Sequence, residues 1–305
     1  MMLPCFLAFS QGAESLGNKP ELTVVARAEY SSIPDTYHLG NSSVYFLVDG
    51  TFSERFSYGA SLHLLCADPK MLYQNTLRSD SVNWLDWAWL SYDFGKCQFL
   101  LGKDYIKVGT WEAEEYDFDC YFETASTWWM MLPVYQWGAS FTWSPSETFF
   151  LTGQVTTSPY GEKPFASGRY TFSLEASTTA LDWYNGIYSV NYINEAIFAM
   201  GHKFMTGNWE FIWDSLTEFR QGYHGFNTLS ASFLPSEKWS LMARASYEND
   251  VLPDYVEELM PNRFAGSFMA NWKPLEQLRV HALAAYDFTL KSPSFNIGLT
   301  WKMSL

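Results

Sequence analysis

A cluster of carboxylates in the middle of the chain is the group of residues best suited to chemistry. Within the segment 107–133, acidic side chains recur at short intervals, and Lys107 is the lone base. The acidic positions are Glu112, Glu114, Glu115, Asp117, Asp119 and Glu123. Closely spaced carboxylates attract cations and repel anions, as rings of Asp and Glu do in cation channels. The cluster therefore predicts a site that selects ions by charge, although a solvated external loop or hairpin would have the same composition.

The histidines do not form a catalytic or metal-binding arrangement. They are His38, His63, His202, His224 and His281. None has a serine partner at a recognisable spacing, and nucleophilic catalysis needs a nucleophile and a base within hydrogen-bond reach. No phosphate-binding loop or nucleotide fingerprint occurs either. We therefore expect no enzyme activity, no cofactor and no metal, and we expect the mid-strand His63, His202 and His281 to be structural or to face a lumen.

The cysteines give no metal site. Cys5 lies in an N-terminal segment that we expect to be removed, which leaves Cys66, Cys97 and Cys120. Three cysteines are an odd number, and their spacing is not that of metal ligands. We interpret them as unpaired, with a disulfide between Cys66 and Cys120 as the alternative.

The elements that would position a charged site follow the alternation of β-strands. In residues 295–305, every second residue is apolar and those between are polar or Gly. Successive side chains of a strand point to opposite faces, so the pattern predicts a strand with one apolar and one polar face. The same alternation recurs between residues 21 and 305 and predicts about sixteen strands, with 183–193 and 195–204 the least regular. Long connections alternate with short ones along much of the chain, as external loops and periplasmic turns do in membrane barrels.

The composition favours a membrane barrel over a soluble β-sandwich. Aromatic residues make up 19% of the chain, with 14 Trp, 19 Tyr and 24 Phe, and membrane proteins concentrate Trp and Tyr at both lipid–water boundaries. Tryptophans recur near the short connections and the carboxyl end, at Trp143, Trp183, Trp209, Trp239, Trp272 and Trp301. No apolar run approaches the roughly 20 residues of a membrane helix, and the mean hydropathy is only -0.15. We predict an all-β fold, a transmembrane antiparallel β-barrel of about sixteen strands.

The net charge and the N-terminal residues bear on partners and location. A net charge of -14 argues against nucleic acid, because phosphate binding needs clustered Lys and Arg. Residues 1–10 have the composition of the end of a secretory signal, with Ala8 and Ser10 at its cleavage site. We expect 11–20 to be a lead-in and 21–305 to form the barrel. The expected location is the outer membrane of a Gram-negative bacterium, in contact with its lipid, with Leu305 recognised by the barrel-assembly machinery.

Charged residues on the inward strand faces would line the interior of such a barrel. Both signs occur, at Arg27, Glu29, Asp49, Asp104, Glu175, Asp214, Arg244, Arg263 and Asp287. About sixteen strands enclose a lumen wide enough for water, so we expect a diffusion channel for small hydrophilic solutes or ions. Plain hydration of the wall would explain the same charges. A barrel that acts as an adhesin, or as a subunit of a secretion or assembly complex, is the alternative from another functional class.

A block in the middle of the chain has a distinctive order: a strand with Asp, a turn, a strand with Gly-Lys and then a loop. It comprises Leu85-Asp86-Trp87-Ala88-Trp89-Leu90, Leu101-Gly102-Lys103-Asp104-Tyr105, Gly109-Thr110-Trp111-Glu112, Tyr135-Gln136-Trp137-Gly138 and Gln154-Val155-Thr156. Over about residues 84–160 the chain resembles Gram-negative outer-membrane porins similar to the phosphate-selective porin O/P family. The resemblance implies a barrel and a channel, with 107–133 as the loop that folds inside and forms the constriction. Because this loop is acidic, we expect cation preference in place of phosphate selectivity; porins of this size suggest a homotrimer.

Overall fold

The alternation of apolar and polar residues folds into consecutive antiparallel strands. The structure is a computed structural model that describes residues 20–33, 36–38, 42–66, 85–114, 134–160, 165, 168–220, 222–249 and 262–305. The strands are β1 (Glu21–Ile33), β2 (Thr36–His38), β3 (Ser43–Thr51), β4 (Phe56–Cys66), β5 (Leu85–Asp93), β6 (Cys97–Tyr105), β7 (Tyr135–Ser146), β8 (Phe149–Thr157), β9 (Tyr170–Leu181), β10 (Tyr184–Tyr192), β11 (Ala196–Thr206), β12 (Trp209–Arg220), β13 (Gly222–Ser236), β14 (Trp239–Asn249), β15 (Asn262–Leu275), β16 (Leu278–Asp287) and β17 (Ser292–Ser304). Within the described ranges, no helix has the length and apolar character needed to cross a membrane.

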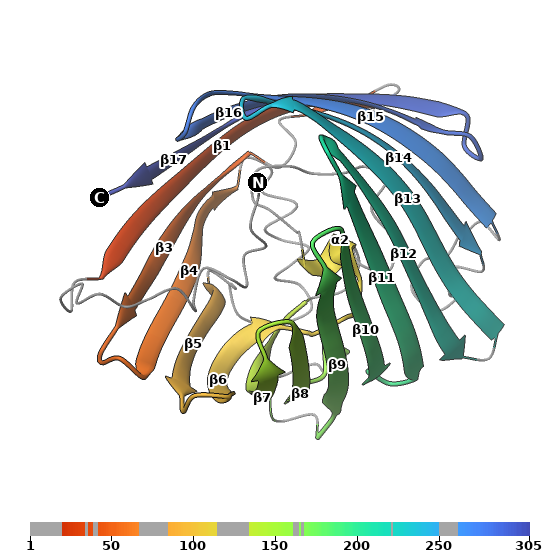
Figure 1. The fold of residues 1–305 in the computed structure, drawn as a ribbon. Coiled ribbons are helices and arrows are strands. Elements are labelled where there is room, and N and C mark those ends of the chain that lie inside the picture. The colour runs from red at the N-terminus through yellow and green to blue at the C-terminus, as the bar shows by residue number, and fades with distance from the viewer. Residues whose placement is uncertain are drawn as a thin grey trace.

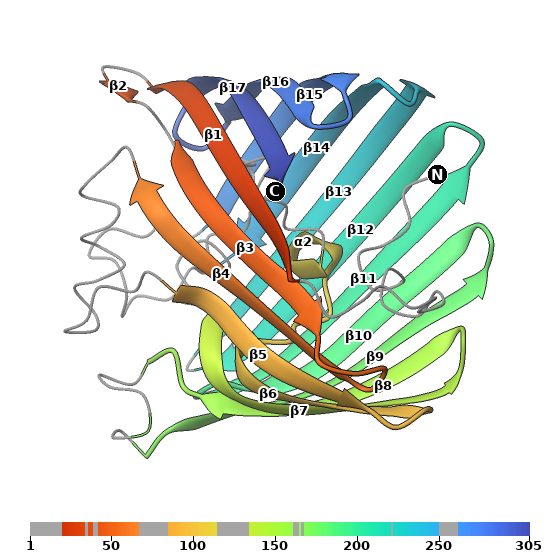
Figure 2. The same cartoon turned by 90° about the vertical axis from the view of Figure 1, so that its left-hand side faces the viewer.

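The sheet closes on itself because the first strand pairs with the last. β1 and β17 are antiparallel from Thr23–Ser304 to Ser32–Phe295, and Figures 1 and 2 show them side by side. Of the 17 strands in the sheet, β2 is a three-residue piece paired with the end of β1, so 16 strands form the wall. Closure leaves no open strand edge in the membrane. The predicted transmembrane antiparallel barrel of about sixteen strands is confirmed.

The wall separates apolar residues on its outer face from polar residues on its inner face. In β17, Phe295, Ile297 and Trp301 are exposed, whereas Asn296 and Thr300 between them are buried. Around the barrel the exposed large side chains are largely aromatic and aliphatic, and Ser, Thr, Asn and Gln are prominent among the buried polar ones. This is the inverse of a soluble protein and suits a wall that faces lipid outside.

The tryptophans predicted to form a girdle lie on the outer face near the short connections. Their side chains are between 42% and 51% exposed, at Trp143, Trp183, Trp209, Trp239, Trp272 and Trp301. The rings of Trp239 and Trp272 stack at 5.9 Å on either side of the β14–β15 pairing. An indole ring at this level keeps its apolar body in the lipid and its N–H near water.

The connections follow the predicted long–short order, with exceptions at the long-loop rim. Turns of two residues join β7 to β8, β9 to β10, β11 to β12, β13 to β14 and β15 to β16. At the opposite rim, 193–195 alone join β10 to β11. Residues 222–225 hold two glycines, a composition typical of a loop, but they belong to β13 and pair with β12. Hydrogen bonding to a neighbouring strand there overrides the weak strand propensity of Gly222 and Gly225.

Some predictions concern residues that the structure does not describe. The predicted signal segment 1–10 and nearly all of the lead-in 11–20 are among them. A disulfide between Cys66 and Cys120 also lies outside the described side chains. Cys97, at the start of β6, is free.

A polar network on the inner face joins the first strand of the sheet with the last two strands, where the barrel closes. Asn296 on β17 donates to Glu29 Oε2 at 3.1 Å and to Ser31 Oγ at 2.7 Å, both on β1. Its Oδ1 lies 2.7 Å from His281 Nε2 on β16. Glu29 also pairs with Arg27 two residues away. The predicted lumen charges Arg27 and Glu29 are therefore inward, but they are buried in a network that links the first strand with the last two.

Replacing Asn296 by Leu should destabilise the closed barrel. The substitution keeps the shape and leaves Glu29, Ser31 and His281 without their shared partner, which costs about 1–3 kcal/mol in free energy of unfolding. Urea unfolding of detergent-solubilised protein measures this difference. Thr300→Val is the matched control, because the Thr300 hydroxyl is buried on the same strand with no hydrogen-bond partner among the described residues. Equal losses in both variants would contradict a specific role for the network.

Candidate pore-lining site

The segment 106–114 leaves the end of β6 and turns into the barrel. It ends in one helical turn, α2 (Trp111–Glu114). Figure 1 shows α2 inside the ring of strands, and α2 contacts β11 and β12, which are five and six strands along the wall from β6. These are the first residues of the loop that the sequence placed at 107–133. The described part of the loop therefore lies against the inner wall, whereas residues 115–133 are not described.

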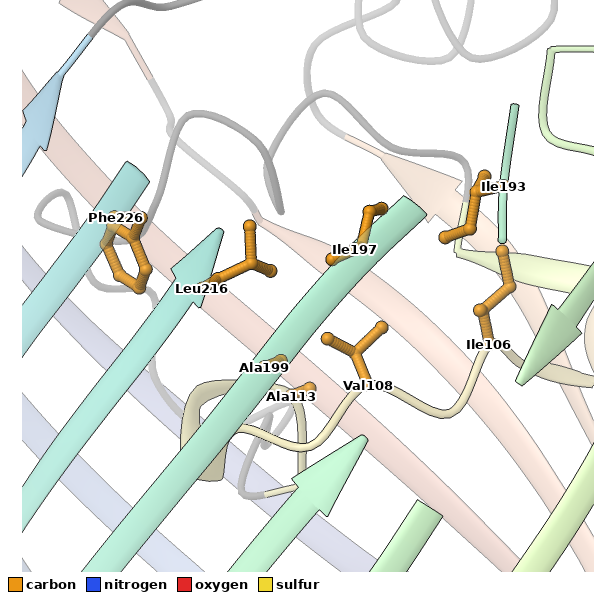
Figure 3. Close-up of a cluster of buried hydrophobic side chains, with 8 residues drawn as sticks. All are labelled: Ile106, Val108, Ala113, Ile193, Ile197, Ala199, Leu216 and Phe226. Carbon is orange, nitrogen blue, oxygen red and sulfur yellow. The ribbon is translucent and has the colours of Figure 1, made fainter. Parts of the chain in front are cut away.

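An apolar cluster fixes this segment to the inner wall. Its members are Ile106, Val108, Ala113, Ile193, Ile197, Ala199, Leu216 and Phe226, all with exposures of 5% or less. Figure 3 shows Val108 and Ala113 of the segment next to Ala199 of β11. Full burial of a side chain such as Val108 contributes about 1.5–3 kcal/mol. The wall thus presents an apolar patch toward the interior where the segment packs.

The apolar patch explains why two strands were the least regular in the sequence. β11 carries apolar residues on both faces: Ile197 and Ala199 are buried inside, while Phe198 is exposed outside. A strand covered on both sides loses its alternation and becomes continuously apolar. The irregular stretches at 183–193 and 195–204 therefore indicated a wall section with something packed inside it.

Side chains of the wall hold the backbone of the segment by hydrogen bonds. Gln154 of β8 accepts from Lys107 N at 2.9 Å and donates to Tyr105 O at 2.9 Å. Asn191 of β10 donates to Lys107 O at 2.5 Å. Ser189 Oγ accepts from Gly109 N at 2.8 Å. These residues were not predicted as site residues. The alternation of polar and apolar residues along their strands does, however, indicate that their side chains point inward.

Asp214 of β12 receives the first amides of α2. Its Oδ1 accepts from Trp111 N at 2.8 Å and its Oδ2 from Glu112 N at 2.9 Å. A helix start leaves such amides without intrahelical partners, and a carboxylate there also interacts favourably with the helix dipole. Close approach depends on Gly201 beside Asp214, because a Cβ at Gly201 would lie 2.6 Å from Asp214 Oδ1 and 2.8 Å from Trp111 Cδ1. The predicted lumen residue Asp214 therefore anchors the inward loop.

Ion pairs and cation–π contacts connect α2 with further wall strands. Arg244 Nη2 of β14 lies 3.1 Å from Glu112 Oε1, and both side chains are less than 10% exposed. The Lys203 ammonium of β11 lies 4.1 Å from the centroid of the Trp111 ring, a distance at which cation–π attraction is effective. Removing one member of a buried charge pair costs about 3–5 kcal/mol. Glu112 and Arg244, predicted separately as loop and wall residues, thus form one pair.

Glu114 lies at the other end of α2, facing the end of β6. Its Oε1 accepts from Tyr105 OH at 2.9 Å. Burial raises the pKa of the Glu114 carboxyl above its usual range, and the nearby Lys107 opposes this rise. Asp104 and Glu175, both predicted wall residues, interact electrostatically with Glu114. The structure therefore brings Asp104, Glu114 and Glu175 into one acidic neighbourhood.

The remaining predicted residues lie away from this segment. Arg263 Nε is 2.8 Å from Asp287 Oδ2, in a pair that joins β15 and β16 near the long-loop rim. Asp49 is exposed near the short-turn rim, in register with Glu21. Glu115, Asp117, Asp119 and Glu123 lie outside the described residues. In the described ranges, no group of His, Cys, Asp and Glu has the arrangement of a metal site.

The histidines divide between the two faces of the wall. His63 stacks on Tyr45 at 4.3 Å on the inner face, and His281 belongs to the seam network. His202 pairs in register with the exposed Trp213 and therefore lies on the outer, lipid-facing side. His202 was expected to be structural or to face the lumen, and the second possibility is wrong. Neighbouring residues of a strand point to opposite faces, and His202 is on the outer one.

The fold is that of bacterial outer-membrane barrels. No protein-family model and no curated protein matches the chain. OmpT of Vibrio cholerae with loop L8 deleted has 12% identity and a TM-score of 0.68, covering 94% of this chain and 99% of that one. The outer-membrane channel DcaP of Acinetobacter baumannii has 10% identity and a TM-score of 0.67, covering 96% and 99%. The anion-selective porin from Comamonas acidovorans has 8% identity and a TM-score of 0.66, covering 94% and 100%.

Replacing Asp214 by Ala should release α2 from the wall. Two amides lose their acceptor, and local opening becomes easier by about 1–3 kcal/mol. Hydrogen–deuterium exchange of a peptide spanning 106–114 should then speed up by about tenfold or more. Ser215→Ala, the next residue on β12, is the matched control and should leave exchange unchanged. Equal protection in the parent and in Asp214→Ala would show that Asp214 is not the anchor.

Proposed function

We propose that this chain is an outer-membrane porin that allows passive diffusion of small hydrophilic solutes. The observation that carries the proposal is a closed 16-stranded barrel with a polar inner wall, across which the segment 106–114 is anchored. A barrel of this size encloses enough space for an aqueous path. The similarity in fold to a channel and a porin supports the same function.

We propose further that the loop 107–133 forms the constriction. Its first residues are held by side chains from β8, β10, β12 and β14, so the loop crosses a large part of the inner wall. Anchoring at several points fixes a loop more firmly than one contact does. The first contact already restricts the conformations of the loop, so each further contact costs less conformational entropy. A fixed loop inside the barrel would set the narrowest part of the path for solutes.

The charges around the anchored segment support a preference for cations. Carboxylates outnumber cationic groups there among the described residues. They are Asp104, Glu112, Glu114, Glu175 and Asp214, against Lys107, Lys203 and Arg244. The similarity to an anion-selective porin does not argue against cation preference. The two chains share a fold at 8% identity, and ion selectivity depends on the side chains along the path, which the fold does not fix.

We also propose the cellular setting that such a porin requires. The protein would reside in the outer membrane of a Gram-negative bacterium and be inserted by the barrel-assembly machinery. A homotrimer is proposed by analogy, since OmpT of Vibrio cholerae has been described in a trimer form. Stable conductance of purified protein would separate this function from that of an adhesin or assembly subunit with a closed interior.

Removing residues 112–128 should widen the path. Single-channel conductance in planar bilayers is expected to rise by about twofold or more when the constricting residues are lost. A deletion of 252–260, in the connection between β14 and β15, is the control at the external rim and should leave the conductance near that of the parent. Unchanged conductance after deletion of 112–128 would exclude the loop as the constriction.

Neutralising the two described loop carboxylates should weaken the preference for cations. In Glu112→Gln/Glu114→Gln, the ratio of cation to anion permeability should fall by about twofold or more, because the loss of the Glu112 carboxylate leaves the charge of Arg244 uncompensated beside the path. Reversal potentials under a potassium chloride gradient measure this ratio. Glu237→Gln, in the exposed turn between β13 and β14, is the control. A parent protein that prefers anions would refute the proposed selectivity.

A further inference from the structure

The outer wall carries a polar cluster where only lipid-facing side chains are expected. Tyr184 and Tyr188 of β10 and His202 of β11 lie on one face, because His202 pairs in register with Gly186 between the two tyrosines. Tyr184 OH is 2.7 Å from Tyr188 OH and 2.8 Å from His202 Nδ1. The side chains are half-buried on the side that also exposes Trp213. Three hydrogen-bonding side chains are thus concentrated on an outer surface whose other large exposed side chains are mostly aromatic and aliphatic.

One hydrogen-bonding atom of this cluster has no protein partner among the residues that the structure describes. His202 Nδ1 faces the tyrosine hydroxyls, and no described residue bonds to its Nε2. A polar atom left unpaired in an apolar medium costs several kcal/mol. The surrounding membrane must therefore supply a polar group at this place if the cost is to be avoided.

A hollow in the outer wall lies beside the cluster. It has a volume of about 630 Å³ and an almost entirely apolar lining. The outward side chains that line it include Phe204, Phe211, Trp213, Leu229, Ala231 and Ala245. Direct register pairs place Phe211 opposite Ala231 and Leu229 opposite Ala245, so these residues share the outer face. Small alanines between large aromatic residues leave a trough in the wall.

The cluster and the hollow are continuous. The His202 ring stacks on Trp213 at 5.2 Å and on Phe204 at 6.5 Å, and both aromatic residues line the hollow. His202 lies four residues before Thr206, the end of β11 at the short-turn rim. At about 3.4 Å per residue and a tilt of about 40°, the ring lies on the order of 10 Å from that rim. The ring therefore lies inside the level of the tryptophan girdle, where the ester groups are the polar groups of a lipid that come nearest to it.

We propose that this surface binds one phospholipid of the surrounding bilayer. An ester oxygen of the lipid accepts a hydrogen bond from His202 Nε2, while Tyr184 donates to His202 Nδ1 and Tyr188 donates to Tyr184, and one acyl chain lies in the hollow. The occupant is an amphiphile because a polar cluster continues directly into an apolar trough. The membrane-facing wall places both parts in contact with such molecules. The site is independent of any pore inside the barrel, so its test and the conductance tests fail or succeed separately.

Native mass spectrometry of the detergent-purified protein with added phosphatidylethanolamine tests the proposal. In His202→Phe the affinity for this lipid should fall about fivefold, because an aromatic ring remains but its hydrogen bonds are lost. In Ala245→Trp the hollow is filled and affinity should fall about tenfold or more. Ala284→Trp, exposed on the outer face of β16, is the matched control and should bind as the parent does.

Three outcomes would overturn the site. Lipid binding in His202→Phe and Ala245→Trp equal to that of the parent would exclude a phospholipid here. An equal loss in Ala284→Trp would mean general binding around the barrel. A change of oligomeric mass in Ala245→Trp with unchanged lipid binding would assign the hollow to a second copy of the chain. If Ala245→Trp does not fold, as judged by circular dichroism, His202→Phe decides alone, since it leaves the wall's packing volume nearly unchanged.

Discussion

The structure depends on the pairing of β1 with β17. In a bilayer no water satisfies an open strand edge, so every backbone N–H and C=O of the wall must bond to a neighbouring strand. The first and last strands meet in antiparallel register because an even number of strands forms the wall. The buried network of Glu29, His281 and Asn296 adds side-chain bonds at the same seam. Closure then fixes which residues face lipid and which face the interior.

Closure also creates an interior that the chain uses in two ways. Much of the inner wall carries hydroxyl and amide side chains, which water can hydrate. One section, formed by β10 to β13, instead presents Ile197, Leu216 and Phe226 inward, where the segment 106–114 packs. Asp214 and Arg244 add directional bonds to α2 beside this apolar patch. Apolar packing thus gives the loop its attachment, and the polar contacts determine its register on the wall.

The outer face shows a departure of the opposite kind. A lipid-facing wall is expected to be apolar throughout, yet Tyr184, Tyr188 and His202 place hydrogen-bonding groups there. Two local breaks in alternation, apolar residues inside and polar residues outside, occur on the neighbouring strands β10 and β11. The inner break is where the inward loop packs, and the outer break is the site that we propose for the polar part of a lipid.

The sequence by itself determined the barrel. Strict alternation in 295–305, tryptophans beside the short connections and the long–short order of connections each follow from local residue types, because strand faces and turns are set by neighbours in the chain. The sequence also singled out Glu112, Asp214 and Arg244 as charged positions. That these three meet, that Gln154, Asn191 and Ser189 hold the loop, and that His202 faces outward were decided only by the tertiary structure. The register of neighbouring strands and the path of a loop depend on contacts between residues far apart in the chain, and no local pattern specifies those.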